Sequence, residues 1–207
     1  MEKIYKDIES NKIPWNIETP PELLIALVTS RTIRPCKLIE LGCGTGNYII
    51  YFSKIGFDAT GVDIAENAIE IARKSALKTG VTCQFVAADV LGALPEIKDK
   101  YDFAYDWELL HHIFPEDREK YVRSIHRLLN PDGRYLSVCF SEDDPQFGGT
   151  GKYRKTPLGT VLYFSNEKEI ESLFKKHFVI EELKTTEIRG KHANHNAIYA
   201  FMRKKNG

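Results

Sequence analysis

The sequence has no net charge, no long apolar run and few cysteines. Its 29 lysines and arginines are balanced by 29 aspartates and glutamates, so the chain as a whole produces no field that attracts nucleic acid or an anionic membrane surface. No apolar stretch approaches the length of a bilayer span, and no apolar signal region stands near the first residue. We therefore expect a cytoplasmic protein whose partner is a small molecule rather than a nucleic acid or a membrane.

The four cysteines are scattered along the chain, and no two of them have the spacing of a metal-binding pair. Most lie in or beside stretches expected to form buried strands, where free cysteine is a packing residue. Cys43 differs because it stands inside a glycine-rich loop. The pair His192 and His195 has no nearby set of carboxylates or cysteines and is a weak metal pattern. We predict no metal site.

A chain of 207 residues, 43% of them apolar, is long enough to bury one substantial core. We expect residues 1–207 to form a single domain, with residues 1–34 as an N-terminal helical arm that covers a core at residues 36–204. Residues 141–160 have no regular pattern and carry the basic run 152–155. We expect a lid-like loop over the substrate, whose basic residues either steer an anionic substrate or are simply solvated.

A strand followed by a glycine-rich turn organises the rest of the chain. Residues 38–41 predict a buried strand, which breaks into Gly42, Gly44 and Gly46, and residues 48–55 predict a helix. Glycine has no Cβ to keep a ligand away from the main chain, and it accepts the positive φ of a tight turn. The three glycines therefore predict a ligand that lies directly on the backbone.

The spacing of the glycines and their neighbours restricts the kind of ligand. A dinucleotide fingerprint needs its third glycine at the sixth position, where this chain has Asn47, and a phosphate-binding loop needs a lysine, which is absent before Lys54. Glu40 stands just before the first glycine, and its carboxylate would oppose a phosphate but suit an ammonium group. The pattern favours a cation-bearing nucleoside, with a nicotinamide dinucleotide as the rival.

Acidic residues also follow three further predicted strands. Asp63 comes about 20 residues after the first glycine, which suits an acid that accepts hydrogen bonds from ribose hydroxyls. Because the carboxyl ends of parallel strands meet at one edge of a sheet, we expect these acids to lie near one another. The predicted strands and the acids at or after their ends are 58–62 with Asp63, 83–87 with Asp89, and 103–105 with Asp106.

The segment from Glu40 to Gly46 resembles the first motif of the class I S-adenosylmethionine-dependent methyltransferases of the small-molecule type. Residues 127–133 resemble the loop before the fifth strand in many of these enzymes, and the resemblance covers roughly residues 36–204. It implies a Rossmann-like α/β fold with helices on both faces of a mostly parallel seven-stranded sheet, in the order 3-2-1-4-5-7-6 with strand 7 antiparallel. The last two strands are expected at residues 178–186 and 197–203.

The resemblance also implies a cofactor, S-adenosylmethionine, and a set of residues that bind it. Trp15 resembles the tryptophan that thiopurine- and tellurite-resistance-type enzymes place over this cofactor, although it also suits a simple anchor for the arm. Asp106 is expected to face the methionine end. The expected cofactor-binding residues are Trp15, Glu40, Gly42, Cys43, Gly44, Gly46, Asp63, Ile64, Asp89, Val90 and Asp106.

No residue is identified as catalytic, and Asp106 and His111 are only weak candidates, because a tandem histidine pair such as this one suits a structural wall equally well. The implied function is methyl transfer to a small-molecule acceptor, which is a thiol, chalcogen, amine or oxygen nucleophile. Two alternatives stay open, a protein that binds the cofactor without turnover and an NAD-dependent dehydrogenase. Nucleic-acid methylation is disfavoured by the zero net charge and by the absence of a base-flipping motif after the fourth strand. The sequence does not indicate an oligomeric state.

Overall fold

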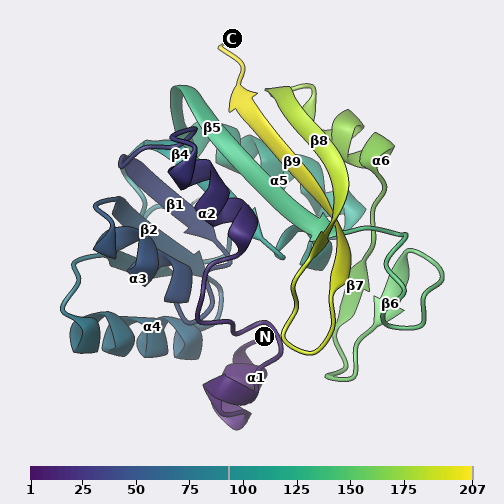
Figure 1. The fold of residues 1–207 in the computed structure, drawn as a ribbon, viewed down its shortest axis with the longest axis horizontal. Coiled ribbons are helices and arrows are strands. Elements are labelled where there is room, and N and C mark those ends of the chain that lie inside the picture. The colour runs from purple at the N-terminus through teal and green to yellow at the C-terminus, as the bar shows by residue number, and fades with distance from the viewer. Residues whose placement is uncertain (93, 207) are drawn as a thin grey trace.

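The computed structural model describes residues 1–92 and 94–206, and a seven-stranded sheet lies at its centre (Figure 1). The strand order is β3-β2-β1-β4-β5-β9-β8. The first five strands in this order, β3-β2-β1-β4-β5, are parallel to one another. Strand β9 is antiparallel to both β5 and β8. Because β8 and β9 are the sixth and seventh strands expected from the sequence, the predicted fold class and sheet order are confirmed. The strands of this sheet are β1 (Lys37–Leu41), β2 (Asp58–Asp63), β3 (Gln84–Ala87), β4 (Tyr101–Trp107), β5 (Leu129–Phe140), β8 (Phe178–Ile188) and β9 (His195–Lys204).

Helices cover both faces of this sheet. Residues of α2, α3 and α4 belong to the core on one face, whereas residues of α5 and α6 belong to the core on the other. In Figure 1, α2 and α3 lie in front of the sheet and α5 lies behind it. The helices are α1 (Glu2–Asp7), α2 (Glu22–Thr29), α3 (Asn47–Lys54), α4 (Glu66–Thr79), α5 (Pro115–Leu128) and α6 (Glu167–Phe174), with short 3₁₀ turns η1 (Ser10–Lys12) and η2 (Leu110–His112). No helix among the described residues is both long and apolar enough to cross a bilayer.

The central strands are buried on both faces, which explains their apolar sequence. Leu38 packs into one core and Ile39 into the other, because successive side chains of a strand point to opposite faces. The chain crosses to the other side of the sheet between β1 and β4, which are neighbours. A crevice forms at such a switch point, outside the carboxyl ends of the strands. The glycine-rich turn after β1 and the segment after β4 both lie there.

The N-terminal segment packs against the sheet domain at two places. Helix α2 contributes Leu24 and Leu27 to one core, and α1 packs on α4. The second contact is a small apolar cluster in which Tyr5 and Ile13 are buried with the start of α4. Figure 1 shows α1 below the sheet, beside α4. The N-terminal segment thus contains two helices, α1 and α2, with the 3₁₀ turn η1 between them.

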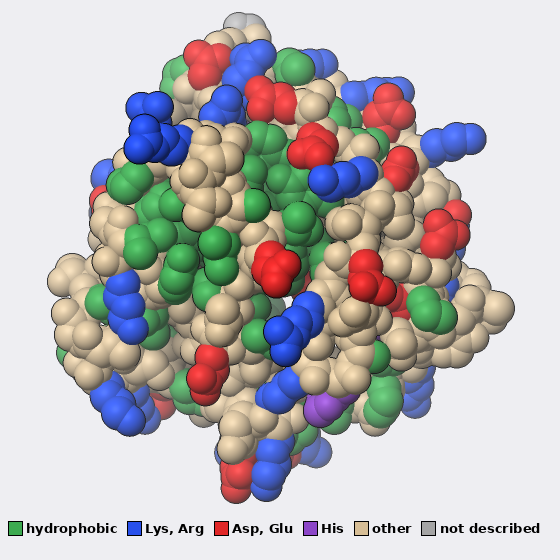
Figure 2. Space-filling view, in the orientation of Figure 1, with side chains coloured by type: hydrophobic (Ala, Val, Ile, Leu, Met, Phe, Trp, Pro, Cys, Tyr) green, Lys and Arg blue, Asp and Glu red, His purple; other side chains and the backbone are tan. Residues whose placement is uncertain are grey.

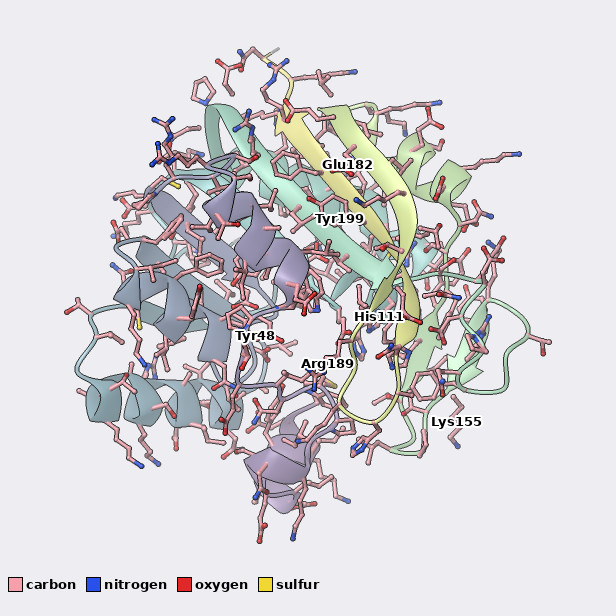
Figure 3. The ribbon with its side chains drawn as sticks, viewed as in Figure 1. Tyr48, His111, Lys155, Glu182, Arg189 and Tyr199 are labelled. Carbon is pink, nitrogen blue, oxygen red and sulfur yellow. The ribbon has the colours of Figure 1, made fainter. Side chains whose placement is uncertain are left out.

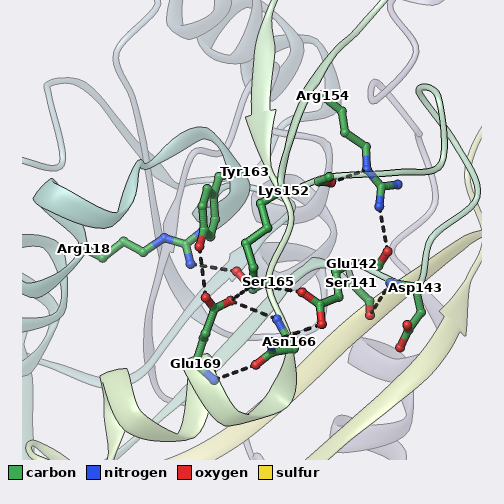
Figure 4. A network of polar contacts seen from close by, with 11 residues as sticks. Arg118, Ser141, Glu142, Asp143, Lys152, Arg154, Tyr163, Ser165, Asn166 and Glu169 are labelled. Atoms are coloured by element: carbon green, nitrogen blue, oxygen red, sulfur yellow. Dashed lines mark hydrogen bonds and ion pairs between the residues drawn. The ribbon is translucent and has the colours of Figure 1, made fainter.

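The segment after β5 is more regular than its sequence indicates. Residues Tyr153–Lys155 form β6 and pair with Val161–Tyr163, which form β7. The buried guanidinium group of Arg154 donates hydrogen bonds to the carbonyl oxygens of Glu142 at 2.6 Å and Gly151 at 2.9 Å, and also to those of Asp144 and Gln146 (Figure 4). A single cation therefore holds the loop in shape from within.

The basic run at 152–155 is not a free cationic patch, because two of its members are used internally. Lys152 forms ion pairs with Glu142 at 2.8 Å and Glu169 at 2.7 Å, and Arg154 is buried (Figure 4). The expectation that this run steers an anionic substrate is wrong for these two residues, because their charges serve the loop itself. Lys155 stays exposed.

We predict that Arg154→Met lowers the free energy of unfolding by about 2 to 4 kcal/mol, because it leaves several buried carbonyl groups without a donor. Methionine keeps most of the apolar stem, so the change reports the loss of the guanidinium group. Lys155→Met, at the exposed neighbouring position, is the matched control and should change stability by less than about 0.5 kcal/mol. Urea unfolding of both variants measures this difference, and equal effects would show that the loop does not depend on Arg154.

Candidate active site

The turn after β1 requires its glycines. Gly42, Gly44 and Gly46 have φ values of 78°, 52° and 76°, in the left-handed region that other residues rarely adopt. A Cβ at Gly46 would also overlap side chains of β3 and α4, and one at Gly42 would lie 2.9 Å from the side chain of Leu109. The main chain at Gly42 and Gly44 thus faces only movable side chains, as a ligand cradle requires.

The carboxylate of Glu40 is the least satisfied polar group of this region. Its side chain is only 3% exposed, and its Oε2 atom has no hydrogen-bond partner among the described residues. The hydroxyl of Tyr105, its pairing partner on β4, is also buried without one. Burial raises the pKa of Glu40 to about 8; the neighbouring Tyr105 hydroxyl opposes this shift and Asp63 adds to it. Buried polar groups in folded proteins are nearly always paired, so these two predict a missing ligand.

Asp63 fastens the glycine turn to the start of α4. One carboxylate oxygen accepts a hydrogen bond from the Gly44 N–H group at 2.8 Å, and the other accepts one from the Ala65 N–H group at 2.8 Å. Burial raises the pKa of Asp63, and these two hydrogen bonds oppose that shift. Each oxygen keeps a second lone pair, so the carboxylate has capacity left for a ligand.

The ends of β2 and β3 lie side by side and carry an exposed apolar residue and an exposed acid. The side chain of Ile64 is 61% exposed, which is unusual for a large apolar residue next to a buried strand. Asp89 is exposed and accepts a hydrogen bond from the Leu91 N–H group at 2.9 Å, whereas Val90 is buried. An apolar side chain beside acceptors for an amino group suits the flat ring of a purine.

The N-terminal arm reaches over the glycine turn. The indole N–H group of Trp15 donates a hydrogen bond to the Tyr5 hydroxyl at 2.8 Å, and the two rings meet edge to face at 6.3 Å. A Cβ at Gly44 would lie 2.9 Å from that hydroxyl. Trp15 therefore approaches the turn through Tyr5. The sequence analysis missed Tyr5, because a tyrosine on a short polar helix gives no sign of distant contacts.

Asn47, which stands where a dinucleotide fingerprint has its third glycine, links the turn to the N-terminal arm. Its side-chain amide donates hydrogen bonds to the Asn16 side chain at 2.8 Å and to the Ile17 carbonyl oxygen at 3.1 Å. The hydroxyl of Thr45 donates to the same Asn16 oxygen at 2.6 Å. The turn therefore binds the arm as well as forming the cradle.

The structure does not bring the side chain of Asp106 to this site, which corrects the expectation that it faces the cofactor. The carboxyl group is fully buried and accepts hydrogen bonds from Tyr121 at 3.0 Å, from Ser137 at 3.1 Å and from Tyr135. Alternation along β4 turns Asp106 toward α5, on the face opposite Tyr105. Burial raises the pKa of Asp106 to about 6. Because its oxygens are occupied, it is also no candidate for catalysis.

Glu108 is the acidic residue that follows β4 toward the crevice, and the sequence analysis missed it. Its φ of 63° is left-handed, a strained conformation for a residue with a side chain. Burial raises the pKa of Glu108 to about 7. Burial raises the pKa of the hydroxyl of Tyr48, at the first turn of α3, and the nearby acids Glu108 and Glu40 raise it too. A positive φ at glutamate has no sequence signal that could have pointed to it.

His111 lies beside the site but is poorly suited to accept a proton. Its Nδ1 atom accepts a hydrogen bond from the Phe140 N–H group at 3.4 Å, and its ring stacks on that phenyl ring at 4.1 Å. Burial lowers the pKa of His111 well below its ordinary value. The neutral ring thus carries its proton on Nε2 and has no free lone pair. Figure 3 shows His111 and Tyr48 on either side of the central hollow, which is visible in Figure 2.

Comparisons with known proteins agree with this geometry. A family model for a methyltransferase domain matches residues 38–133, which include the glycine turn, the ends of β2, β3 and β4, and the segment that follows β4. Over this stretch, which is just under half of the chain, the sequence is similar to that methyltransferase domain. The matched region contains all the expected cofactor-binding residues except Trp15, which lies on the arm.

Individual curated proteins are similar to a large part of the chain. The ubiquinone biosynthesis O-methyltransferase of Bordetella avium (strain 197N) is 29% identical over 162 residues, 76% of this chain and 66% of that protein. The probable thiol methyltransferase 2 of Arabidopsis thaliana is 24% identical over 74% of this chain and 71% of its own. Three of the curated relatives are matched over only 66%, 39% and 35% of their length.

A solved structure shares the fold. The S-adenosylmethionine-dependent methyltransferase from Anabaena variabilis ATCC 29413 superposes with a TM-score of 0.77 at 20% sequence identity, over 99% of this chain and 93% of that one. At this identity the likeness shows the fold and does not transfer a substrate.

We predict that the thermal stability of the ligand-free protein falls as the pH rises from about 5 to about 9. An unfolded Glu40 ionises near its ordinary pKa of 4.5, whereas the folded one keeps its proton up to about 8. The stabilisation from that retained proton is complete below about 4.5 and is lost as the pH rises through about 8.

Glu40→Gln should remove much of this pH dependence, because glutamine stays neutral throughout. Glu18→Gln replaces an exposed carboxylate and is the control that should keep the slope. Scanning calorimetry across this range measures both variants. A slope that is unchanged in Glu40→Gln would show that Glu40 is ionised in the folded protein at neutral pH.

Proposed function

We propose that this protein transfers the methyl group of S-adenosylmethionine to a small-molecule acceptor. The observation that carries the proposal is the unpaired, buried carboxylate of Glu40 beside a left-handed glycine turn. A ligand with an ammonium group satisfies that carboxylate, and burial makes the pairing stronger than it would be in water. The acceptor class stays broad at this level and includes thiols, chalcogens, amines and oxygen nucleophiles.

The residues around the turn fit this cofactor from one end to the other. An ammonium group beside Glu40 and Glu108 favours their ionised forms, so both acids then offer negative charge for the methionine part. Asp63 offers acceptors for the ribose hydroxyls. Ile64 offers an apolar surface for the adenine ring. We assign the adenine edge to Asp89 and Val90, and the cover to Trp15 together with Tyr5. The backbone at Gly42, Cys43, Gly44 and Gly46 completes the proposed site.

The bound cofactor supplies an electrophilic methyl group, which is attached to a sulfonium sulfur. Once the methyl group is transferred, that sulfur becomes a neutral thioether. The protein must then align the acceptor and exclude water, and positioning of this kind supplies about 7 to 11 kcal/mol of the barrier reduction. We propose that residues 1–34 cover the cofactor and that residues 141–160 form a wall of the acceptor site. In this arrangement residues 1–207 act as a single domain. The cytoplasmic location stays a prediction.

Two alternatives predict different ligands. A nicotinamide-dependent dehydrogenase would bind NADH, but the Asn47 side chain and the Glu40 carboxylate both disfavour a pyrophosphate at the turn. A cofactor-binding protein without activity would bind S-adenosylmethionine and transfer nothing. Calorimetric titration with S-adenosylhomocysteine and with NADH distinguishes a methyltransferase from a dehydrogenase. A panel of acceptors with radiolabelled S-adenosylmethionine distinguishes an active enzyme from a protein that only binds the cofactor. Binding of NADH alone would overturn the proposal.

We predict that Asp63→Ala weakens the binding of S-adenosylhomocysteine more than tenfold. The substitution removes a charge-assisted hydrogen bond worth about 1.5 to 3 kcal/mol, and it also releases the turn at Gly44. Asp58→Ala, at the exposed beginning of the same strand, is the matched control and should bind as the unchanged protein does. Isothermal titration calorimetry measures both. Equal affinities for the two variants would place the ribose elsewhere.

A further inference from the structure

A histidine and a buried carboxylate form a hydrogen-bonded pair at the edge of the acceptor region. The Nδ1 atom of His195 lies 3.2 Å from an oxygen of Asp144. Asp144 is fully buried, and its two oxygens also accept hydrogen bonds from the N–H groups of Asn196 at 2.6 Å and Gln146 at 2.7 Å. The carboxylate is therefore fixed in place by the backbone before it meets the imidazole.

This pairing decides which ring nitrogen carries the proton. A carboxylate that receives hydrogen bonds from two N–H groups acts as an acceptor, so Nδ1 of His195 is the donor and carries the hydrogen. The Nε2 atom of the neutral ring then has a free lone pair. It has no hydrogen-bond partner among the described residues, and it is not fully buried. Nε2 of His195 is thus accessible and able to accept a proton, unlike the Nε2–H group of His111.

Gly190 packs beside the Nε2 edge of the His195 ring. A Cβ at Gly190 would lie 3.2 Å from Nε2, so a side chain at this position would cover that edge. The guanidinium group of Arg154 donates a hydrogen bond to the carbonyl oxygen of Asp144 and so holds the segment that carries the carboxylate. The pair therefore rests on a rigid support.

The pair lies at the same edge of the sheet as the proposed cofactor site. His195 begins β9 and stacks at 4.4 Å on Phe140, the last residue of β5, whose other neighbour in the stack is His111 after β4. The three rings cross the carboxyl ends of the strands. In Figure 3, Arg189 from the loop before β9 points into the hollow opposite Tyr48, so this loop borders the site.

We propose that His195 is the general base of the reaction and that Asp144 positions it. The inference rests on the proposed function. Nε2 of His195 takes the proton of an O–H or S–H group of the acceptor as its oxygen or sulfur bonds to the methyl carbon. The bond from that carbon to the sulfonium breaks, and its electron pair stays on the sulfur of the departing thioether. The proton ends on His195, whose positive charge Asp144 stabilises until water removes the proton.

A built-in base narrows the acceptor class. Phenols and thiols with pKa values of about 8.5 to 10 are mainly protonated at neutral pH and gain from a base at the moment of transfer. Anionic chalcogen acceptors need none, and an unprotonated amine attacks through its lone pair and loses its proton afterwards. The arrangement therefore favours a phenol or a thiol.

The test compares acceptors that differ in acidity. His195→Gln and Asp144→Asn are assayed at neutral pH with phenols and aromatic thiols whose pKa values range from about 5 to about 10. We expect His195→Gln to lower kcat/KM by about 10² to 10⁴ for the least acidic acceptors, and by much less for those already ionised. His192→Gln, an exposed histidine in the same loop, is the control and should lose no activity.

Two further measurements do not depend on turnover. Calorimetry should give the same affinity for S-adenosylhomocysteine in all three variants and in the unchanged protein. Nitrogen NMR of histidine-labelled protein should show His195 with its hydrogen on Nδ1, and Asp144→Asn should abolish that tautomer preference. The opposite tautomer in the unchanged protein overturns the assignment.

The outcomes separate the two proposals. A loss in His195→Gln that is the same for all acceptors, or no loss at all, overturns the role of the pair while methyl transfer stands. Failure of the unchanged protein to methylate any acceptor overturns the proposed function, and the role of the pair falls with it.

Discussion

The whole site depends on one unfavourable burial, that of the Glu40 carboxyl group at the end of β1. Backbone groups in the sheet satisfy one another, but this side chain has an oxygen that the described residues leave unpaired. A cost of this kind persists in folded proteins when a ligand or a reaction compensates it. The positive φ angles of the glycine turn place the main chain beside Glu40. The charge of this acid and the shape of the turn therefore favour the same cation-bearing ligand.

The glycine turn also organises its surroundings through two short-range links. Asp63 joins it to the first turn of α4, and Asn16 joins it to the N-terminal arm through Thr45 and Asn47. The cofactor cradle is thus held by elements that are distant in sequence. The loop after β5, the proposed wall of the acceptor site, is built differently, because an internal arginine and a stack of rings fix it.

The sequence alone predicted the parts of this structure whose cause is local. Three glycines at a strand end and apolar strands of the right length indicated an α/β sheet, whereas the expected sheet order came from the resemblance to a known family. Asp106 was misplaced because strand alternation, not sequence position, decides which face a side chain points to. The pairing of Asp144 with His195 was out of reach, since 51 residues separate two side chains that meet only after β9 is added to β5.

The fastening of the arm has a consequence for the order of events in a catalytic cycle. Tyr5 and Trp15 lie over the turn. The first seventeen residues of the arm are held there by a few side-chain hydrogen bonds and a small apolar cluster, whereas α2 packs into the main core. Detaching such a segment costs far less than unfolding the sheet. On the proposed function, release of the spent cofactor requires a transient opening of the first seventeen residues.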